Sequence, residues 1–447
     1  MQDAAAVETD SLFGKLRGML ASRPFLKDVS IMLTGSAGGQ AVSLLLSPLL
    51  TRLYSPQEFG ILSVYSAVIA ILVVVASLRY ELALPLVRDD EDAVNLMAVC
   101  LLALAGTTMV VGTVSFLSPD IWIERFWPIP LDPAHSVIYR LLLVAGYACL
   151  GGYFVALYVA TRVNAYTAIA RTRLAQGVVG PTSQIGLALL GAGAPGLLFG
   201  SILGQSAGTF GLFGTVASGK SRLLHAISWP RMKAQALRFR QFPLVGSWAA
   251  LIDAIGSSQL LYLLITITYS ARIAGFIFLA ERVVSRPLSI IGTSILQVFV
   301  GEAGKTITSD PALLKRRFYQ VVTRQFAMAA VWILLANLVA ILLFPIMFGE
   351  EWRDGVPYLE AISIAYLAQA VVLPVFHTLQ LLERQSMAAA WQVGRLILTV
   401  GVFSAGVALD FPAPTVIAAY SVAQAAACAV FLGMMARSIN QIQQVQR

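Results

Sequence analysis

The chain has 447 residues and a formal net charge of +8, and 58% of its residues are hydrophobic while only 12% are charged. Its mean hydropathy is +0.77. Soluble chains carry about 25% charged residues, so this composition excludes a string of soluble domains and indicates one polytopic membrane domain. The basic balance does not indicate nucleic-acid binding, because most lysines and arginines lie between apolar segments, where they set membrane topology. The three cysteines lie inside apolar segments, which predicts packing residues and neither a disulfide framework nor a metal site.

Residues 1–28 are interpreted as a cytoplasmic N-terminal segment. Within it, residues 11–22 (SLFGKLRGMLAS) place their large apolar side chains on one helical face, with Lys15 and Arg17 off that face. This pattern is typical of a short helix lying on the membrane surface. A frayed polar tail is the alternative interpretation.

About twelve apolar segments follow, each long enough to cross a bilayer. We expect all of them to be helical, because every peptide group in lipid needs a partner within its own segment. In chain order the expected spans are 29–51, 59–79, 93–118, 135–161, 167–191, 195–217, 243–267, 271–299, 318–344, 356–382, 387–409 and 413–435.

Charge predicts the orientation of these spans. Lysines and arginines are concentrated in alternate loops, which are expected to remain cytoplasmic, so both termini are predicted to be inside. Three tryptophans of the opposite loops, Trp122, Trp127 and Trp352, are typical of an aromatic belt at the membrane surface. Those loops hold few basic residues beyond Arg52, Arg125, Arg272 and Arg353.

Short matches recur along the chain at an offset of about 215 to 222 residues, which indicates an internal repeat. Because each copy would contain six spans, both copies enter the membrane from the same side, and a binding site is expected between them. The matches are Tyr54-Ser55 with Gly60 and Tyr269-Ser270 with Gly275, then Arg162 with Arg384, then Pro195 with Pro414.

The predicted fold is therefore an all-α polytopic membrane protein, with two pseudo-symmetric six-helix lobes around a central cavity. The N-lobe is assigned to residues 29–217 and the C-lobe to 243–436. A basic cytoplasmic linker, 218–242, joins them, and 437–447 form a cytoplasmic tail. Glycines at every fourth position, such as Gly200, Gly204 and Gly208, predict close helix packing.

Several ionisable residues fall deep inside the expected spans, where a charge costs a few kcal/mol or more. In GFIFLAERVVSRPLSIIG (275–292), Glu281 and Arg282 lie about ten residues from the outer end of the eighth span, which is roughly 15 Å deep. Arg286 follows one turn later, just before Pro287, which should loosen the helix. Asp253, Arg173 and Arg395 are the other deep charges, while Arg79 and Glu81 lie near the inner end of the second span.

Two interpretations of these charges remain open. They line a polar cavity between the lobes, or Asp253 forms a structural ion pair with Arg282 or Arg286. The repeat favours a functional role for these charges in one half only, because the corresponding positions of the N-lobe carry no charge. Those positions are Gly38 for Asp253, Ser66 for Glu281, Ala67 for Arg282 and Ile71 for Arg286.

Two segments resemble the polysaccharide transporter (Wzx-like) flippases of the multidrug/oligosaccharidyl-lipid/polysaccharide superfamily. Residues 47–87, SPLLTRLYSPQEFGILSVYSAVIAILVVVASLRYELALPLV, are similar to the opening signature of that family. Residues 344–367, FPIMFGEEWRDGVPYLEAISIAYL, resemble the segment that leads into its tenth helix. The resemblance implies a V-shaped pair of lobes around a cationic cavity. It also implies transfer of an undecaprenyl-pyrophosphate-linked oligosaccharide, such as an O-antigen unit of lipopolysaccharide, across the bacterial inner membrane.

Relatives keep arginines on the second and eighth helices. Arg282 and Arg286 match the eighth-helix position, and Arg79 matches the second only loosely. Where related flippases place an arginine in the first helix, this chain has Gln40. On this interpretation Arg282 and Arg286 contact the headgroup, because guanidinium binds phosphate oxygens in pairs, with Arg395, Arg173 and Arg79 as further contacts.

Alternating access is expected, without ATP, cofactor or bound metal, and with H⁺ or Na⁺ as a possible coupling ion. Asp253, Glu281 and Glu81 are the candidates for ion coupling or gating. The expected partners are the lipid-linked glycan, membrane lipids and the polysaccharide polymerase machinery, and the chain is expected to work as a monomer. One alternative is a multidrug or organic-cation antiporter of the same superfamily. A membrane enzyme acting on lipid-linked glycans is disfavoured, since the longest outer loop, 119–134, offers only Asp120, Glu124, Arg125 and Asp132 for catalysis.

Overall fold

The computed structural model describes residues 24–120, 133–217, 225–255 and 259–445, and none of these residues lies in a β-strand. The predicted fold class, a helical membrane protein with two lobes, is confirmed. The expected surface helix at 11–22 lies outside the described residues and stays a prediction.

The N-lobe contains eight α-helices among the described residues. They are α2 (Pro24–Leu45), α3 (Ser47–Leu53), α4 (Pro56–Leu72), α5 (Asp90–Leu117), α7 (Pro133–Arg162), α8 (Tyr166–Leu189), α9 (Gly193–Ser206) and α10 (Thr209–Ala217). Two 3₁₀ segments, η1 (Val73–Val75) and η2 (Tyr80–Leu86), continue α4, and α12 (Trp229–Arg238) lies in the linker.

The C-lobe begins with a π turn, η3 (Phe242–Gly246), and contains a second π turn at η4 (Glu281–Ser285). Its α-helices are α13 (Ser247–Ile255), α14 (Gln259–Thr268), α15 (Ala271–Ala280), α16 (Arg286–Ser309), α17 (Pro311–Phe348), α18 (Val356–Val372), α19 (Thr378–Leu381), α20 (Gln385–Ala408) and α21 (Ala413–Val445). The 3₁₀ segments η5 (Glu350–Gly355) and η6 (Leu373–Val375) flank α18.

Within the described part of the chain, nine helices are long and apolar enough to cross a membrane. A tenth crossing is obtained if Phe242–Ile255 and Gln259–Thr268, which meet at 51°, form one span. Helix α8 is not among these nine, although it falls where a span is expected. Its polar residues Gln176 and Gln184, which line the cavity described below, lower its hydropathy.

The repeated dipeptides mark corresponding helix starts. The Ser55 side chain accepts the backbone N–H of Glu58, and the Glu58 side chain accepts that of Ser55, which completes a capping box. The Ser270 side chain likewise accepts the N–H of Ile273 and caps α15. The same local signal therefore begins α4 in one lobe and α15 in the other.

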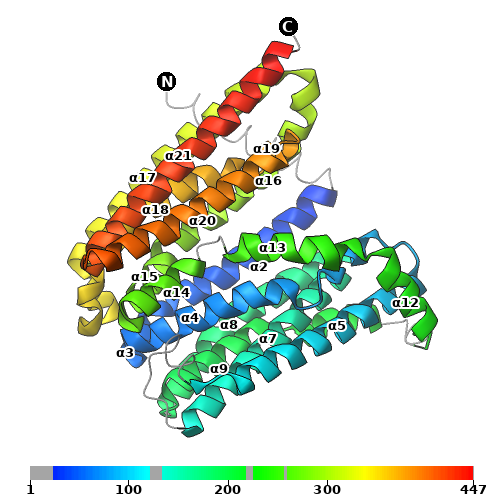
Figure 1. The fold of residues 1–447 in the computed structure, drawn as a ribbon, viewed down its shortest axis with the longest axis horizontal. Helices are drawn as coiled ribbons and strands as arrows, with labels where there is room; N and C mark the ends of the chain where they lie inside the picture. Colours follow the sequence, from blue (N-terminus) through cyan, green and yellow to red (C-terminus); the bar gives the residue numbers. More distant parts are fainter. Residues whose placement is uncertain (1–23, 121–132, 218–224, 256–258, 446–447) are drawn as a thin grey trace, which may run out of the picture.

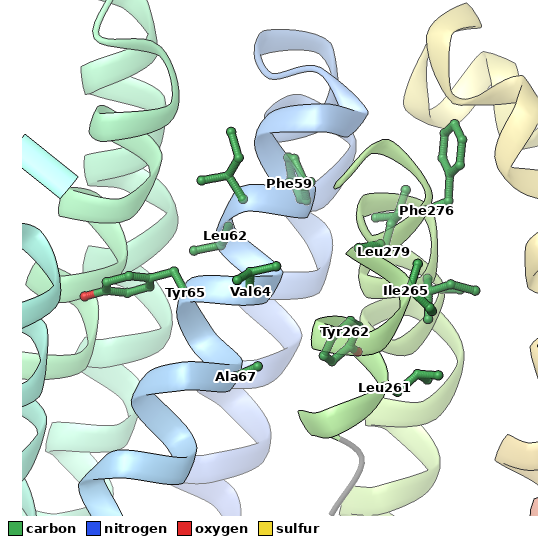
Figure 2. Close-up of a cluster of buried hydrophobic side chains, with 14 of the residues drawn as sticks. Phe59, Leu62, Val64, Tyr65, Ala67, Leu261, Tyr262, Ile265, Phe276 and Leu279 are labelled. Carbon is green, nitrogen blue, oxygen red and sulfur yellow. The ribbon is translucent and has the colours of Figure 1, made fainter. Parts of the chain in front are cut away.

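The two lobes meet through these corresponding helices. A Cβ atom added at Gly60 would overlap the carbonyl oxygen of Ala271, and one added at Gly275 would overlap that of Pro56. Because Gly60 corresponds to Gly275 and Pro56 to Ala271, the contact is self-complementary, as at a two-fold interface. Figure 2 shows the apolar side chains of α4, including Phe59 and Val64, beside those of α14 and α15.

We name this end of the molecule, formed by α3, η5 and the starts of α4 and α15, the α3 end. Trp352 is 1% exposed there and its indole N–H donates to the carbonyl of Thr51 at 2.9 Å. Its ring packs edge-on against Phe59 of one lobe and Phe276 of the other. The prediction that Trp352 belongs to an aromatic belt is therefore wrong, because its indole fills the junction between the lobes.

From the α3 end the lobes diverge. In Figure 1 the helices of the two lobes converge near α3, α14 and α15 and separate toward the opposite end, which carries α12 and the last turns of α21. We name that end the α12 end. The molecule is thus V-shaped, with its vertex at the α3 end.

The glycine contact yields a stability prediction. Gly60→Ala should lower the melting temperature of the purified protein in detergent, because the new methyl group meets rigid backbone that cannot rotate away. Gly106→Ala is the matched control, since a Cβ there meets nothing within 4 Å and alanine is the better helix former. Equal melting temperatures for Gly60→Ala and the unchanged protein would contradict the close contact.

Candidate functional site

The site is built around the π turn Glu281–Ser285, which interrupts the long helical segment from α15 to α16. The backbone N–H of Arg286 donates to the carbonyl of Glu281, five residues earlier, as a π turn requires. Pro287 follows and has no N–H to donate to the preceding turn. The indole of Trp332 donates to the Val284 carbonyl at 3.0 Å, so a neighbouring helix satisfies part of this loosened backbone.

The π turn decides which charges meet. Residues four apart face the same way in an α-helix, so the sequence places Arg286 beneath Arg282. In the structure Arg286 Nε instead donates to Glu281 Oε1 at 3.2 Å, five residues back. The other carboxylate oxygen of Glu281 accepts the hydroxyl of Tyr262, from α14. The carboxylate is thus shared by one guanidinium and one phenol.

Arg282 points in another direction and bridges the lobes. Its Nη2 donates to the carbonyl of Ser43 at 3.0 Å and to the hydroxyl of Ser43 at 2.6 Å. Ser43 lies on α2, so a cation of the C-lobe is held by neutral acceptors of the N-lobe. Ser43 therefore satisfies two donors of Arg282 without neutralising its charge.

These residues line a cavity of about 610 Å³ between the lobes. Its charged lining residues are Glu281, Arg282 and Arg286, all from the C-lobe. Arg286 has the more accessible side chain of the ion pair, 54% exposed against 17% for Glu281. The N-lobe wall, from α2, α4, α7, α8 and α9, contains no charged residue among those that line the cavity.

The other predicted deep charges lie outside the cavity lining. The Nη1 of Arg173 donates to the hydroxyl of Ser36 at 2.9 Å, and the guanidinium of Arg395 stacks on Trp391 at 4.9 Å. Asp253 accepts the amide of Gln392 at 2.5 Å. Arg173 and Asp253 thus join neighbouring helices, whereas Arg395 stacks on a residue of its own helix, α20.

The predicted ion pair between Asp253 and Arg282 or Arg286 is not present in the structure. No hydrogen bond or ion pair recorded between described residues joins Asp253 to Arg282 or Arg286, and Glu281 is the carboxylate that faces Arg286. The four-residue spacing predicted that Arg286 lies beneath Arg282, and Pro287 predicted a loosened helix without indicating which charges meet. The π turn rotates Arg286 back toward Glu281.

Arg79 and Glu81 follow the end of α4 and η1, at the start of η2. They also lie outside the cavity lining. The second span ends earlier than the expected 59–79, at Val75, and Arg79 has a left-handed backbone with φ +64°. Glu81 is 6% exposed and accepts the hydroxyl of Ser77 at 2.5 Å. These two residues belong to a buried turn near the α12 end.

The loop 119–134 offers no assembled catalytic group in its described part. Asp120 accepts Ser136 Oγ and Arg140 Nη2, each at 2.7 Å, and these two donors lower the pKa of its carboxyl group. Glu124, Arg125 and Asp132 lie outside the described residues. Asp120 therefore ties the end of α5 to α7.

Sequence reasoning missed Tyr262 and the neutral polar residues of the N-lobe wall. Tyr262 carries no pattern of its own, because its role depends on how α14 packs against η4. The wall does leave a signal: Gln176, Gly180 and Gln184 recur at every fourth position and so share one helical face.

Comparisons with known proteins agree with this architecture. The family described as "Polysaccharide biosynthesis protein" matches residues 49–357. The chain belongs to the polysaccharide biosynthesis protein family. None of the curated proteins compared matches the sequence.

The solved structures similar to this family member are transporters. An inward-facing multidrug resistance MATE family transporter of the MOP superfamily is 14% identical, with a TM-score of 0.56 over 94% of this chain and 99% of the other. Its outward-facing form gives a TM-score of 0.57 at 14% identity, over 94% and 96% of the two chains. A MATE protein in complex with MaL6 gives 0.59 at 14% identity, over 94% and 97%. At 14% identity these likenesses show that the chain shares the fold of these transporters.

The contact between Arg282 and Ser43 yields a second prediction. Arg282→Leu should lower the melting temperature more than Ser43→Ala, because Ser43→Ala removes one acceptor and keeps the carbonyl. A hydrogen bond to a charged group contributes about 1.5–3 kcal/mol. The comparison uses purified protein in one detergent, and a larger loss for Ser43→Ala would contradict the recorded geometry.

Proposed function

We propose that this protein moves an undecaprenyl-pyrophosphate-linked oligosaccharide from the cytoplasmic to the outer leaflet of the bacterial inner membrane by alternating access. The observation that supports this most is the charge of the cavity, in which two arginines face one carboxylate. Guanidinium groups bind phosphate oxygens in pairs and remain ionised. An anionic headgroup fits this cavity better than a cation does.

The proposed orientation places the α12 end in the cytoplasm. The linker that contains α12 carries Arg231, Lys233, Arg238 and Arg240, and basic loops stay inside. Both termini are then cytoplasmic, and the lobes are closed at the outer, α3 end. The structure would thus represent a state that receives its substrate from the cytoplasmic leaflet, with the isoprenoid chain remaining in lipid between the lobes.

Transport would then require the lobes to rock about their junction. Opening the α3 end separates Gly60 from Ala271 and removes Trp352 from its position between the lobes. The bond between Arg282 and Ser43 also crosses the junction, so the cation is free to change partners during this movement. The headgroup is released where these contacts have opened.

Glu281 acts in this proposal as an internal competitor of the substrate. Its carboxylate holds Arg286, and an incoming pyrophosphate must displace it. Binding of H⁺ or Na⁺ at Glu281 would weaken that ion pair, so Glu281 is the preferred coupling residue. Asp253 and Glu81, which lie outside the cavity lining, are candidates for other steps of the cycle, as are the cations Arg173, Arg395 and Arg79.

The first test of this function replaces the cavity arginines. Arg282→Ala and Arg286→Ala should each abolish most surface-glycan display while protein abundance in the membrane stays normal, because the anion loses its paired donors. Arg317→Ala is the control, since that side chain is half-exposed and paired with Glu302 on the surface of α16 and α17. Full display in both cavity variants would refute the headgroup role.

The second test concerns Glu281. Glu281→Gln should bind undecaprenyl pyrophosphate more tightly than the unchanged protein does, by about tenfold if one competing ion pair is lost, and should turn over more slowly. Its flux in proteoliposomes should also lose any response to an imposed proton or sodium gradient. Weaker binding in Glu281→Gln would contradict the competition between carboxylate and substrate.

The shared fold with MATE transporters keeps an organic-cation antiporter as the second candidate. Such a substrate would meet a net positive cavity, which opposes its binding. Competition is the distinguishing measurement: undecaprenyl pyrophosphate should not be displaced by lipophilic cations. As a flippase, the protein is proposed to act as a monomer and to deliver its product to the polysaccharide polymerase machinery.

A further inference from the structure

The N-lobe wall of the cavity is polar without being charged. Besides Tyr153 of α7 and the Ser43 hydroxyl that holds Arg282, four of its helices contribute residues with carboxamide or hydroxyl groups to the cavity lining. We name this surface the amide wall; it comprises Gln40, Ser66, Gln176, Gln184, Ser201 and Gln205.

Close packing of α8 on α9 builds most of the amide wall. A Cβ at Gly204 would lie 2.5 Å from the Cα of Gly180, so the two backbones touch at the glycines. Gln176 and Gln184 stand one turn to either side of Gly180 on α8, and Gln205 follows Gly204 on α9. The glycine contact therefore brings the polar rows of two helices into one surface.

Hydrogen bonds hold these side chains in place. The amide of Gln176 donates to the backbone carbonyl of Gln205 at 2.8 Å, and the amide of Gln205 donates to Ser201 Oγ at 2.9 Å. The amide of Gln184 donates to the carbonyl of Leu197 at 3.1 Å. Each of these bonds uses an N–H of a carboxamide and leaves its oxygen with its full capacity as an acceptor.

The wall is costly to keep in a membrane protein. Polar side chains lower the gain from placing a helix in lipid, and α8, which carries Gln176 and Gln184, is not among the nine described helices that are apolar enough to span a membrane. Simple packing would be served by apolar residues at the same positions. A surface of neutral donors and acceptors suits a ligand rich in hydroxyl and amide groups.

We propose that the amide wall is a glycan subsite that binds uncharged sugar residues through their hydroxyl and acetamido groups, while Arg282 and Arg286 bind the pyrophosphate. This inference rests on the proposed function and adds a selectivity to it. Because no charged group of the N-lobe lines the cavity, the wall offers hydrogen bonds to neutral sugars and no ion pair to an acidic one. The ionic and neutral parts of one headgroup are thus divided between the two lobes.

The test measures binding of the full-length protein in lipid nanodiscs to three probes. They are undecaprenyl pyrophosphate alone, the same lipid carrying a neutral N-acetylated disaccharide, and the same lipid carrying a disaccharide with one uronic acid. The neutral disaccharide should tighten binding relative to the sugar-free lipid. Gln176→Met and Gln205→Met should each reduce that gain by about tenfold, the effect of about one neutral hydrogen bond, and should leave binding of the sugar-free lipid unchanged.

Thr182→Val is the matched control, because Thr182 lies on α8 outside the cavity lining and its hydroxyl bonds to carbonyls of its own helix. Equal binding of all three probes by the unchanged protein would overturn the glycan subsite and leave the anion site intact. A sugar-dependent gain that survives both glutamine substitutions would also overturn it. Failure of the proposed function is distinguishable, since the sugar-free lipid would then bind no better to the unchanged protein than to Arg286→Ala.

Discussion

The shared carboxylate of Glu281 is the interaction on which the cavity depends. An isolated ion is costly in an apolar bundle, so Glu281 is stable there only with Tyr262 on one oxygen and Arg286 on the other. That arrangement exists because the backbone forms an i→i+5 hydrogen bond at this point, from the N–H of Arg286 to the carbonyl of Glu281, which brings the two residues together. With Arg286 directed to Glu281, Arg282 is left to cross the cavity to Ser43.

The two lobes share a fold and differ in chemistry. Their symmetry is retained at the α3 end, where Gly60 and Gly275 allow backbones to touch. It is broken in the cavity, where Glu281 and its counterpart Ser66 both contribute to the lining but only Glu281 is charged. A junction that must open and close benefits from symmetry, because two equal halves can rock about one axis. A binding site benefits from asymmetry, because the ligand that it binds is itself not symmetric.

Much of the fold was predictable from local sequence. Long uncharged segments predict spans because peptide groups in lipid must be paired internally, and Ser55 and Ser270 do cap corresponding helices. The site was predictable only in part. Arg282 and Arg286 line the cavity as expected, whereas Arg173 and Arg395 pack against Ser36 and Trp391 outside its lining. Helical depth is readable from residue counts, but the direction of a side chain around the helix is not, once a π turn or a left-handed residue changes the register.

The sequence by itself determined that the chain is a two-lobed helical membrane protein and that the charges nearest the middle of its spans, Asp253, Glu281 and Arg282, belong to the C-lobe. Those properties follow from composition, repeat offset and residue type, all of which can be read along the chain without knowing how its helices pack. Only the tertiary structure decided that Arg286 pairs with Glu281 and not with Asp253, that Trp352 fills the junction, and that glutamines of α8 and α9 form one wall. Each of these depends on which helix faces which, and that is set by close contacts between residues far apart in the chain.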